Sequence, residues 1–273
     1  MNKIAKKIAA GLLAVSVATT GLTFDIQKAE AFNLGKIGKD IGKSLENVGK
    51  GIGGAVGGAV GGVLGGGKNG GQVDVQGLRK SETLLLANLA VSAGLMNSAL
   101  EQCKMATGQS AANAHLMQTN AVVRNLNKND MGAAVNMKNA ADKAKKDKVD
   151  VAIKNNLSAA ITSGDEAKLK RIDSYIKNAN QQRMISDALG AIAVVQAGKI
   201  ISDTIKGGLS VNNAGNIVKF AKTAKEAQSL LSARSKLSKM LSTATAEYKK
   251  TRGIKDPTKA EIDKTAKTMS ANE

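Results

Sequence analysis

The fold is decided by the stretch from Ser163 to Gly208, SGDEAKLKRIDSYIKNANQQRMISDALGAIAVVQAGKIISDTIKGG. Ser163 followed three residues later by Glu166 has the form of a capping box, which predicts the start of a helix. Gly207 and Gly208 predict its end near Lys206, because glycine favours the position after a helix C-terminus. Two groups of apolar residues at helical spacing lie between these signals: Leu169, Ile172, Ile176 and Ala179, then Ile185, Ala188, Leu189, Ile192 and Val195. The stretch predicts a helix of roughly 40 residues, about 60 Å long.

A second long helix is expected directly after this one. Asn212 or Asn213 is a suitable N-cap residue. The apolar positions that follow keep a helical spacing: Ile217, Phe220, Ala224, Leu231, Leu237, Leu241, Ala244 and Tyr248. Because only a short turn separates the two helices, we expect them to pair as an antiparallel hairpin.

Shorter helices are expected on either side of the hairpin. Upstream, the sequence predicts helices from Leu78 to Met105, ending before Gly108, then two between residues 109 and 148 broken around residues 125–130, then one from Val149 to Ile161. Downstream, Asp256 and Pro257 predict a last short helix with the proline in its first turn, where the missing N–H does no harm. The fold class is therefore all-α. We expect an elongated helical bundle over residues 77–250, with a short helix and tail over residues 256–273.

The composition agrees with a helical fold. Aromatic residues make up 2% of the chain, Trp is absent and there is one proline. Large sheet-based cores normally use aromatic residues as their bulkiest side chains, and proline breaks helix interiors. Long helices that meet along alanine, leucine and isoleucine are therefore favoured.

Residues 1–31 have the pattern of a secretory signal peptide. Lys3, Lys6 and Lys7 precede an uncharged apolar run from Ile8 to Phe24, and Ala29 and Ala31 form an A-x-A cleavage site. Cleavage after Ala31 predicts a bacterial protein exported to the periplasm, cell envelope or extracellular space. The alternative interpretation is an amphipathic N-terminal helix.

Residues 32–50 form a cationic amphipathic segment. Leu34, Ile37, Ile41, Leu45 and Val48 share one helical face. Four lysines lie mostly off that face, at Lys36, Lys39, Lys43 and Lys50. Segments of this kind lie on anionic bilayers, so these lysines are candidate contacts to an anionic membrane or cell-wall polymer.

Residues 51–71 are rich in glycine, with alanine, valine, isoleucine and leucine between the glycines. Gly53, Gly57, Gly61 and Gly65 are four residues apart, a small-xxx-small pattern that lets helices approach closely in lipid. The tract is a candidate for membrane packing or for a homo-oligomer contact. The alternative is a flexible linker, since glycine-rich segments also serve as spacers.

The net charge and the scarcity of catalytic residue types reduce the number of possible function classes. Forty basic against 22 acidic residues give a net charge of +18, which favours anionic partners. Nucleic acid is disfavoured because the basic residues are spread along helices and almost no aromatic residues interleave with them. The single histidine, His115, excludes a multi-histidine metal site, and Cys103 fits a buried apolar position on its predicted helix. No catalytic, cofactor-binding or metal-ligating residue is predicted, and the protein is not expected to be an enzyme.

These patterns favour an exported, non-enzymatic helical protein of the cell envelope that associates with anionic membranes or polymers through its N-terminal segments. Two alternatives are open. A long helical hairpin joined to an apolar segment resembles the α-helical pore-forming toxins, and a cationic segment before a Gly/Ala/Val tract resembles cecropin-type peptides and some bacteriocins. This resemblance implies a secreted, membrane-damaging protein. The other alternative is a polyanion-binding adhesin, in which the glycine tract is a spacer and binding falls with salt.

Overall fold

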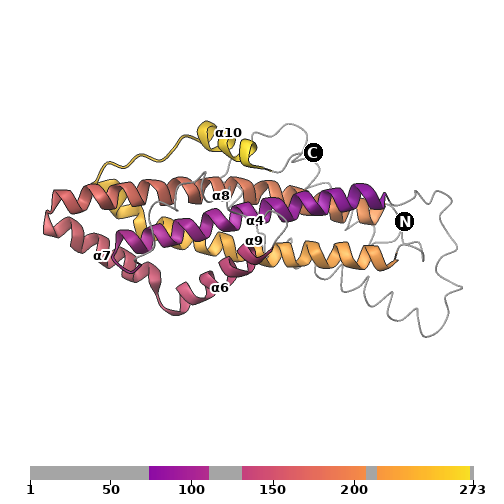
Figure 1. Ribbon diagram of the computed structural model, residues 1–273, viewed down its shortest axis with the longest axis horizontal. Helices are drawn as coiled ribbons and strands as arrows, with labels where there is room; N and C mark the ends of the chain where they lie inside the picture. Colours follow the sequence, from indigo (N-terminus) through magenta and orange to yellow (C-terminus); the bar gives the residue numbers. More distant parts are fainter. Residues whose placement is uncertain (1–73, 111–130, 207–213, 271–273) are drawn as a thin grey trace, which may run out of the picture. The chain divides into compact units, whose positions relative to one another are not determined.

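A computed structural model describes residues 74–110, 131–206 and 214–270, and every regular element in these ranges is a helix. The all-α prediction is therefore confirmed for this part of the chain. The helices, shown in Figure 1, are α4 (Val75–Ala106), α6 (Gly132–Lys146), α7 (Val149–Ser163), α8 (Glu166–Lys206), α9 (Ala214–Thr251) and α10 (Lys259–Met269).

The chain divides into two compact units, and the three longest helices each contribute to both. The first unit comprises Met1–Glu82 and Val194–Gln228, and the second comprises Thr83–Ala193 and Ser229–Glu273. In the described part of the first unit, Phe220, Leu78 and Ala224 are buried. There the Thr223 hydroxyl donates a hydrogen bond to Glu82 Oε1 over 2.6 Å, which joins α9 to α4.

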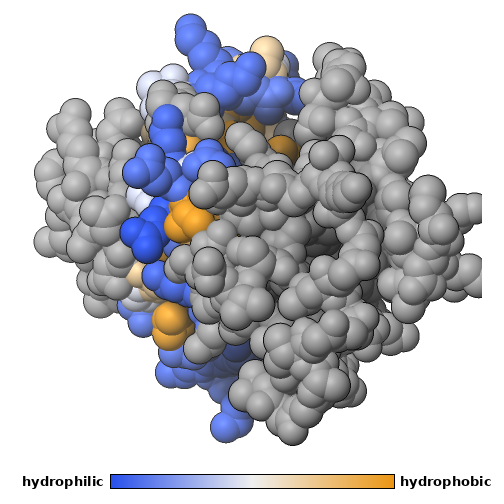
Figure 2. Space-filling model, turned by 90° about the vertical axis from the view of Figure 1, so that its right-hand side faces the viewer, coloured by the Kyte–Doolittle hydropathy of each residue, from blue (hydrophilic) through white to orange (hydrophobic). Residues whose placement is uncertain are grey.

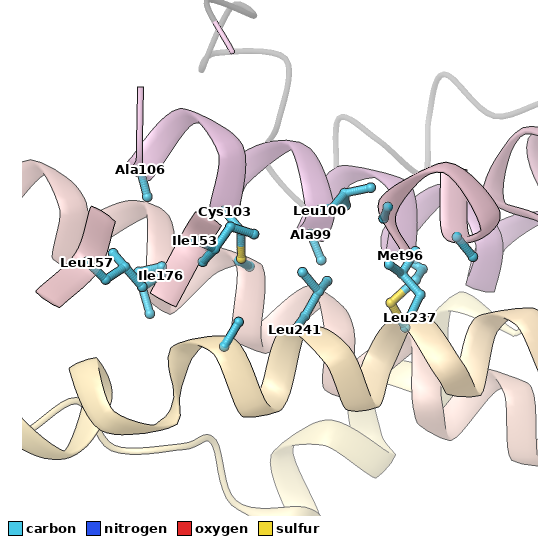
Figure 3. Packing of buried hydrophobic residues seen from close by; sticks show 14 of the residues in the cluster. Met96, Ala99, Leu100, Cys103, Ala106, Ile153, Leu157, Ile176, Leu237 and Leu241 are labelled. Atoms are coloured by element: carbon cyan, nitrogen blue, oxygen red, sulfur yellow. The ribbon is translucent and has the colours of Figure 1, made fainter. Parts of the chain in front are cut away.

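The second unit has a core built from five helices. Its largest apolar cluster takes residues from α4, α6, α7, α8 and α9, and Figure 3 shows Met96, Cys103, Ile153, Ile176 and Leu241 converging in it. Small alanines, including those at positions 99, 134 and 179, fill the remaining seams. Among the described residues, Tyr248 is the one aromatic residue buried in this cluster, and leucine, isoleucine, methionine and alanine supply most of the remaining close packing.

Within the second unit, α8 and α9 run antiparallel. Glu166 and Asp173 of α8 bind Arg252, directly after the end of α9, whereas Asp187, further along α8, binds Ser238 and Arg234, earlier in α9. Residue numbers thus rise along one helix as they fall along the other. The predicted extent of the first long helix, to about Lys206, is confirmed.

Two predicted helix starts are wrong in detail. Ser163 does not cap α8: it is the last residue of α7, and its hydroxyl donates to the Ala160 carbonyl. Gly164, with φ of +63°, ends α7, and the Asp165 carboxylate accepts from the Lys168 amide at the start of α8. The turn needs Gly164 in the left-handed region, so the acidic residue after it takes the capping position.

The second correction concerns the last helix. Pro257 does not lie in its first turn, because Thr258 is the N-cap and the helix begins at Lys259. Thr258 and Glu261 form a reciprocal capping box in which each side chain accepts from the other residue's amide. The helix then packs Ile262 and Ala266 against Val91, Leu95 and Ile185 of α4 and α8.

The helix α4 begins slightly earlier than expected. Asp74 accepts from the Gly77 amide over 2.9 Å, so the helix starts at Val75 rather than at Leu78. Its other end agrees with the prediction, since Gly108 follows it with φ of +72°. The buried stripe predicted on this helix is confirmed: Leu85, Leu89, Ser92, Met96, Ala99 and Cys103 are all buried.

Candidate functional site

The residues that the sequence predicts to contact a membrane or partner, or otherwise singles out, lie outside the described residues. These are the lysines Lys36, Lys39, Lys43 and Lys50, the glycines Gly53, Gly57, Gly61 and Gly65, the cleavage-site residues Ala29 and Ala31, and the lone His115. Their roles stay predictions. The described helices show instead how the charges of the body are distributed.

One polar network joins α8 to α9 inside the second unit, and Asp187 is at its centre. The Asp187 carboxylate accepts from Arg183 over 3.1 Å, from the Ser238 hydroxyl over 2.7 Å, and from Arg234. Both arginine side chains are nearly buried, at 13% and 11% exposure. A partly buried carboxylate between two guanidinium groups is well compensated, so the network holds the two helices in one register.

The network continues towards the last helix through Asn180. Its amide donates to Asp256 Oδ1 over 2.7 Å, and its carbonyl oxygen accepts from Arg183 and from Lys249. Lys249 also binds Asp256 over 2.6 Å. These contacts fix the segment that leads from α9 into α10.

Gly190 makes room for this network. A Cβ atom at this position would lie 2.5 Å from Nε and 2.6 Å from Cζ of Arg234, closer than side chains tolerate. The Arg234 Nε atom is buried and has no hydrogen-bond partner among the described residues. The guanidinium therefore lies close to Gly190 of α8, and a larger residue there would displace it.

A second polar cluster joins the start of α8 to the end of α9. Arg252 donates to both Glu166 oxygens over 3.1 and 3.2 Å and to Asp173 over 3.0 Å, and the Tyr248 hydroxyl donates to Asp173 over 2.8 Å. Burial alone would raise the pKa of Asp173, but the hydrogen bonds from Arg252 and Tyr248 outweigh it and hold that pKa below 3.8. Burial and the Asp173 contact raise the pKa of Tyr248.

Neither cluster has the form of a catalytic site. Each acidic group is compensated by arginine or lysine, and in the part of the chain that the structure describes no group of three or more residues could hold a metal ion. Cys103 is buried, which raises the pKa of its thiol from 9.0 to about 12 despite the opposing charge of Arg183. A thiol with that pKa stays protonated at neutral pH and is a poor nucleophile.

The second unit pairs many of its acidic groups and leaves many basic ones facing solvent. Six of its carboxylates are in ion pairs within the unit: Glu101, Glu166, Asp173, Asp187, Glu247 and Asp256. Many lysines face outward: Lys138, Lys143, Lys145, Lys146, Lys148, Lys168, Lys170, Lys177, Lys236, Lys239, Lys250, Lys255 and Lys264. On the face shown in Figure 2, the described residues are mostly hydrophilic, with isolated hydrophobic side chains.

Most of the positive charge belongs to the helical body. Residues 74–273 hold 31 of the 40 basic residues and 18 of the 22 acidic ones, so they carry 31 − 18, or +13, of the net +18. The sequence prediction places its candidate contacts in residues 32–50 and the glycine tract, and uses the charge of the helical body only in the adhesin alternative. The signal was available in the run KAKKDK, Lys143 to Lys148, but the neighbouring aspartates made it resemble an ordinary solvated helix face.

Among the described helices, α4 is long and apolar enough to cross a membrane by length and composition. However, 78% of its most apolar window is buried inside the molecule. Burial in a helical core explains this apolarity without a membrane.

Comparisons of the chain with protein-family models, with curated proteins and with solved structures find no match.

Proposed function

We propose that the protein is an exported, non-enzymatic helical protein of the cell envelope that associates with anionic membranes or polymers. One observation carries the proposal: six carboxylates of the second unit are paired with its own arginines and lysines, while many further lysines face solvent. A surface arranged in this way attracts polyanions and repels cationic partners.

The N-terminal segments add to this attraction. Lys36, Lys39, Lys43 and Lys50 in the cationic amphipathic segment would contact the same anionic surface. The glycine tract would either pack in the bilayer through Gly53, Gly57, Gly61 and Gly65 or act as a spacer. In both cases the helical body stays close to the surface that its lysines bind.

Co-sedimentation with vesicles separates the two contributions. The mature chain, residues 32–273, and a form that begins at Asp74, and so keeps the α4 cap, are mixed with vesicles of phosphatidylglycerol. We expect both forms to pellet, the longer one more completely, since the body holds +13 of the charge. If neither form pellets with the vesicles or binds a soluble polyanion such as polyphosphate, the proposal is wrong.

A second candidate function is membrane damage by insertion, and the apolarity of α4 is the observation that favours it. In this case α4 would leave its buried position and enter the bilayer beside the glycine tract. Release of a dye trapped in phosphatidylglycerol vesicles tests it. A protein that only binds the surface leaves the dye inside, whereas an inserting protein releases it.

A further inference from the structure

The corner between α6 and α7 differs from the rest of the second unit. Helix α6 ends at Lys146, α7 begins at Val149, and only Asp147 and Lys148 connect them. In Figure 1 the two helices form a V whose tip points away from α8. A convex corner of this kind suits a flat partner better than a small ligand, which requires a concave site.

Positive charge is concentrated at this corner. Residues 138–148 contain five lysines and two aspartates, a net charge of +3 within eleven residues. Lys138, Lys143, Lys145, Lys146 and Lys148 are all exposed. Lysines in the last turn of a helix also complement its dipole, but this reason does not extend to Lys138, two turns earlier, or to Lys148 beyond the helix end.

Lys148 has an unfavourable backbone conformation. Its φ of +51° and ψ of +43° lie in the left-handed region, where an L-residue with a Cβ atom is strained. Among the described residues, the other positive-φ positions are Gly108, Gly164 and Gly253. Glycine would relieve the strain here too, so a lysine in this place indicates that its charge is used.

One exposed apolar side chain flanks the lysines. Val135 is 50% exposed and Val151 is 49% exposed. Among the described residues, the other exposed large hydrophobic residue is Val195. Val135 is in the first turn of α6, at the end of the helix away from the corner, so it does not belong to the corner itself. Val151 follows Lys148 by three residues in α7. Lysines with apolar neighbours are typical of surfaces that contact anionic lipid.

We propose that this corner, defined by Lys143, Lys145, Lys146 and Lys148 with Val151, is the surface by which the helical body docks on an anionic phospholipid bilayer. The lysines bind lipid phosphates, and Val151 enters the headgroup region. The inference rests on the proposed function and adds which surface is used and that the anion is a lipid.

The absence of tryptophan from the chain allows a direct test by fluorescence. In the mature protein, Val151→Trp places one reporter at the corner, and Thr243→Trp places a matched reporter at an exposed position of α9. With vesicles of equal parts phosphatidylglycerol and phosphatidylcholine, we expect a blue shift of emission for the corner reporter and none for the control. Equal shifts at both positions, or no shift in a protein that pellets with the vesicles, would overturn the assignment of the corner.

Matched charge variants give the second readout. One variant replaces Lys143, Lys145, Lys146 and Lys148 with Gln, and the control replaces Lys236, Lys239, Lys250 and Lys264 with Gln, so both lose four charges. A lysine at an anionic bilayer is worth about a fivefold change in binding. We therefore expect a loss of at least about tenfold for the corner variant and about twofold for the control.

Three outcomes separate a failure of the corner assignment, a failure of lipid as the partner and a failure of the proposed function. Equal losses in the two variants would show general charge attraction, which leaves the proposed function standing and removes the corner from it. Binding of polyphosphate but not of vesicles by the unchanged protein would assign a soluble polymer in place of lipid. If the unchanged protein binds neither, the proposed function fails together with the inference.

Discussion

Lys148 holds a conformation that glycine holds at Gly108, Gly164 and Gly253. Removing its Cβ atom relieves the left-handed strain, so Lys148→Gly is expected to raise the free energy of unfolding by about 1 kcal/mol. The same change removes a corner charge and is expected to weaken vesicle binding severalfold. Chemical denaturation and co-sedimentation measure the two effects.

The control for this prediction is Lys148→Ala, which removes the charge and keeps the Cβ atom and its strain. We expect it to lose binding like the glycine variant without the gain in stability. A glycine variant that binds as well as the unchanged protein would show that the charge of Lys148 is not used.

Asp173 predicts a pH dependence of stability. Because its pKa in the folded protein lies below the ordinary 3.8, its contacts with Arg252 and Tyr248 stabilise the fold fully above that value. The contribution is lost as the pH falls through the lowered pKa and the carboxylate takes up a proton. Asp173→Asn is expected to cost about 1 kcal/mol at neutral pH, a value reduced for partial solvent exposure.

Thermal unfolding between pH 7 and pH 2 measures this effect. The unchanged protein and the Asp173→Asn variant are expected to differ most near neutral pH and to converge in acid. A constant difference over the whole range would show that the variant acts through packing and not through the charge.

For individual residues, the sequence patterns predict the buried positions of α4 correctly and the N-cap residue of α8 incorrectly. The burial of Cys103 and of the other stripe residues on α4 is confirmed, because a spacing of three and four leaves a helix only one apolar face. The capping residue of α8 was assigned to Ser163, although Asp165 does the capping. Aspartate is as good an N-cap residue as serine, and Asp165 caps the helix because Gly164 takes the left-handed turn.

Among the elements, the contact between α8 and α9 depends on Gly190. Its replacement by alanine gains about 1 kcal/mol of helix propensity, but the new Cβ atom would displace the Arg234 guanidinium from Asp187. Breaking a buried ion pair costs more than that gain. We therefore expect Gly190→Ala to lower the free energy of unfolding by about 2 kcal/mol.

A double-mutant cycle checks the cause. In an Arg234→Met background the long flexible side chain can move aside, so Gly190→Ala is expected to be neutral or slightly stabilising. A cost that persists in this background would show that the alanine clashes with something other than the guanidinium.

The attachment of α10 is a second property at this scale. Thr258 and Glu261 close its first turn, and Ile262 and Ala266 anchor it against α4 and α8. Thr258→Ala removes the cap and is expected to destabilise the helix by about 1 kcal/mol. Hydrogen exchange should show faster exchange of amides in α10 and unchanged protection in the core of α9. Equal acceleration in both helices would mean that α10 does not unfold separately.

The long helices themselves were predictable because their apolar period, end glycines and length all agree. The sequence located the end of α8 at Lys206 and the turn after α4 at Gly108. It did not predict the Asp187 network. Arg183 and Asp187 have the spacing of a helical ion pair, but the contribution of Arg234 and Ser238 depends on the register between two helices. Such a register is a tertiary property that neither helix encodes alone.

For the whole molecule, the proposed contact with an anionic surface depends on how the charges are distributed. A net charge of +18 is visible in the sequence, but a sum does not show which charges are neutralised by neighbours. The structure shows partly buried carboxylates such as Asp173 and Asp187 paired with arginine, while lysines such as Lys145 and Lys239 face outward. This arrangement makes the helical body, in addition to its N-terminal segments, a candidate for contact with an anionic surface.

The most direct measurement of this claim is co-sedimentation of the mature chain with phosphatidylglycerol vesicles and with phosphatidylcholine vesicles over a range of salt concentrations. We expect binding to the anionic vesicles at low salt, a steep fall as salt screens the lysines, and almost no binding to the neutral vesicles. Equal binding to both lipids, or binding that salt does not weaken, would contradict the account, because the exposed lysines would then not be what holds the protein on the membrane.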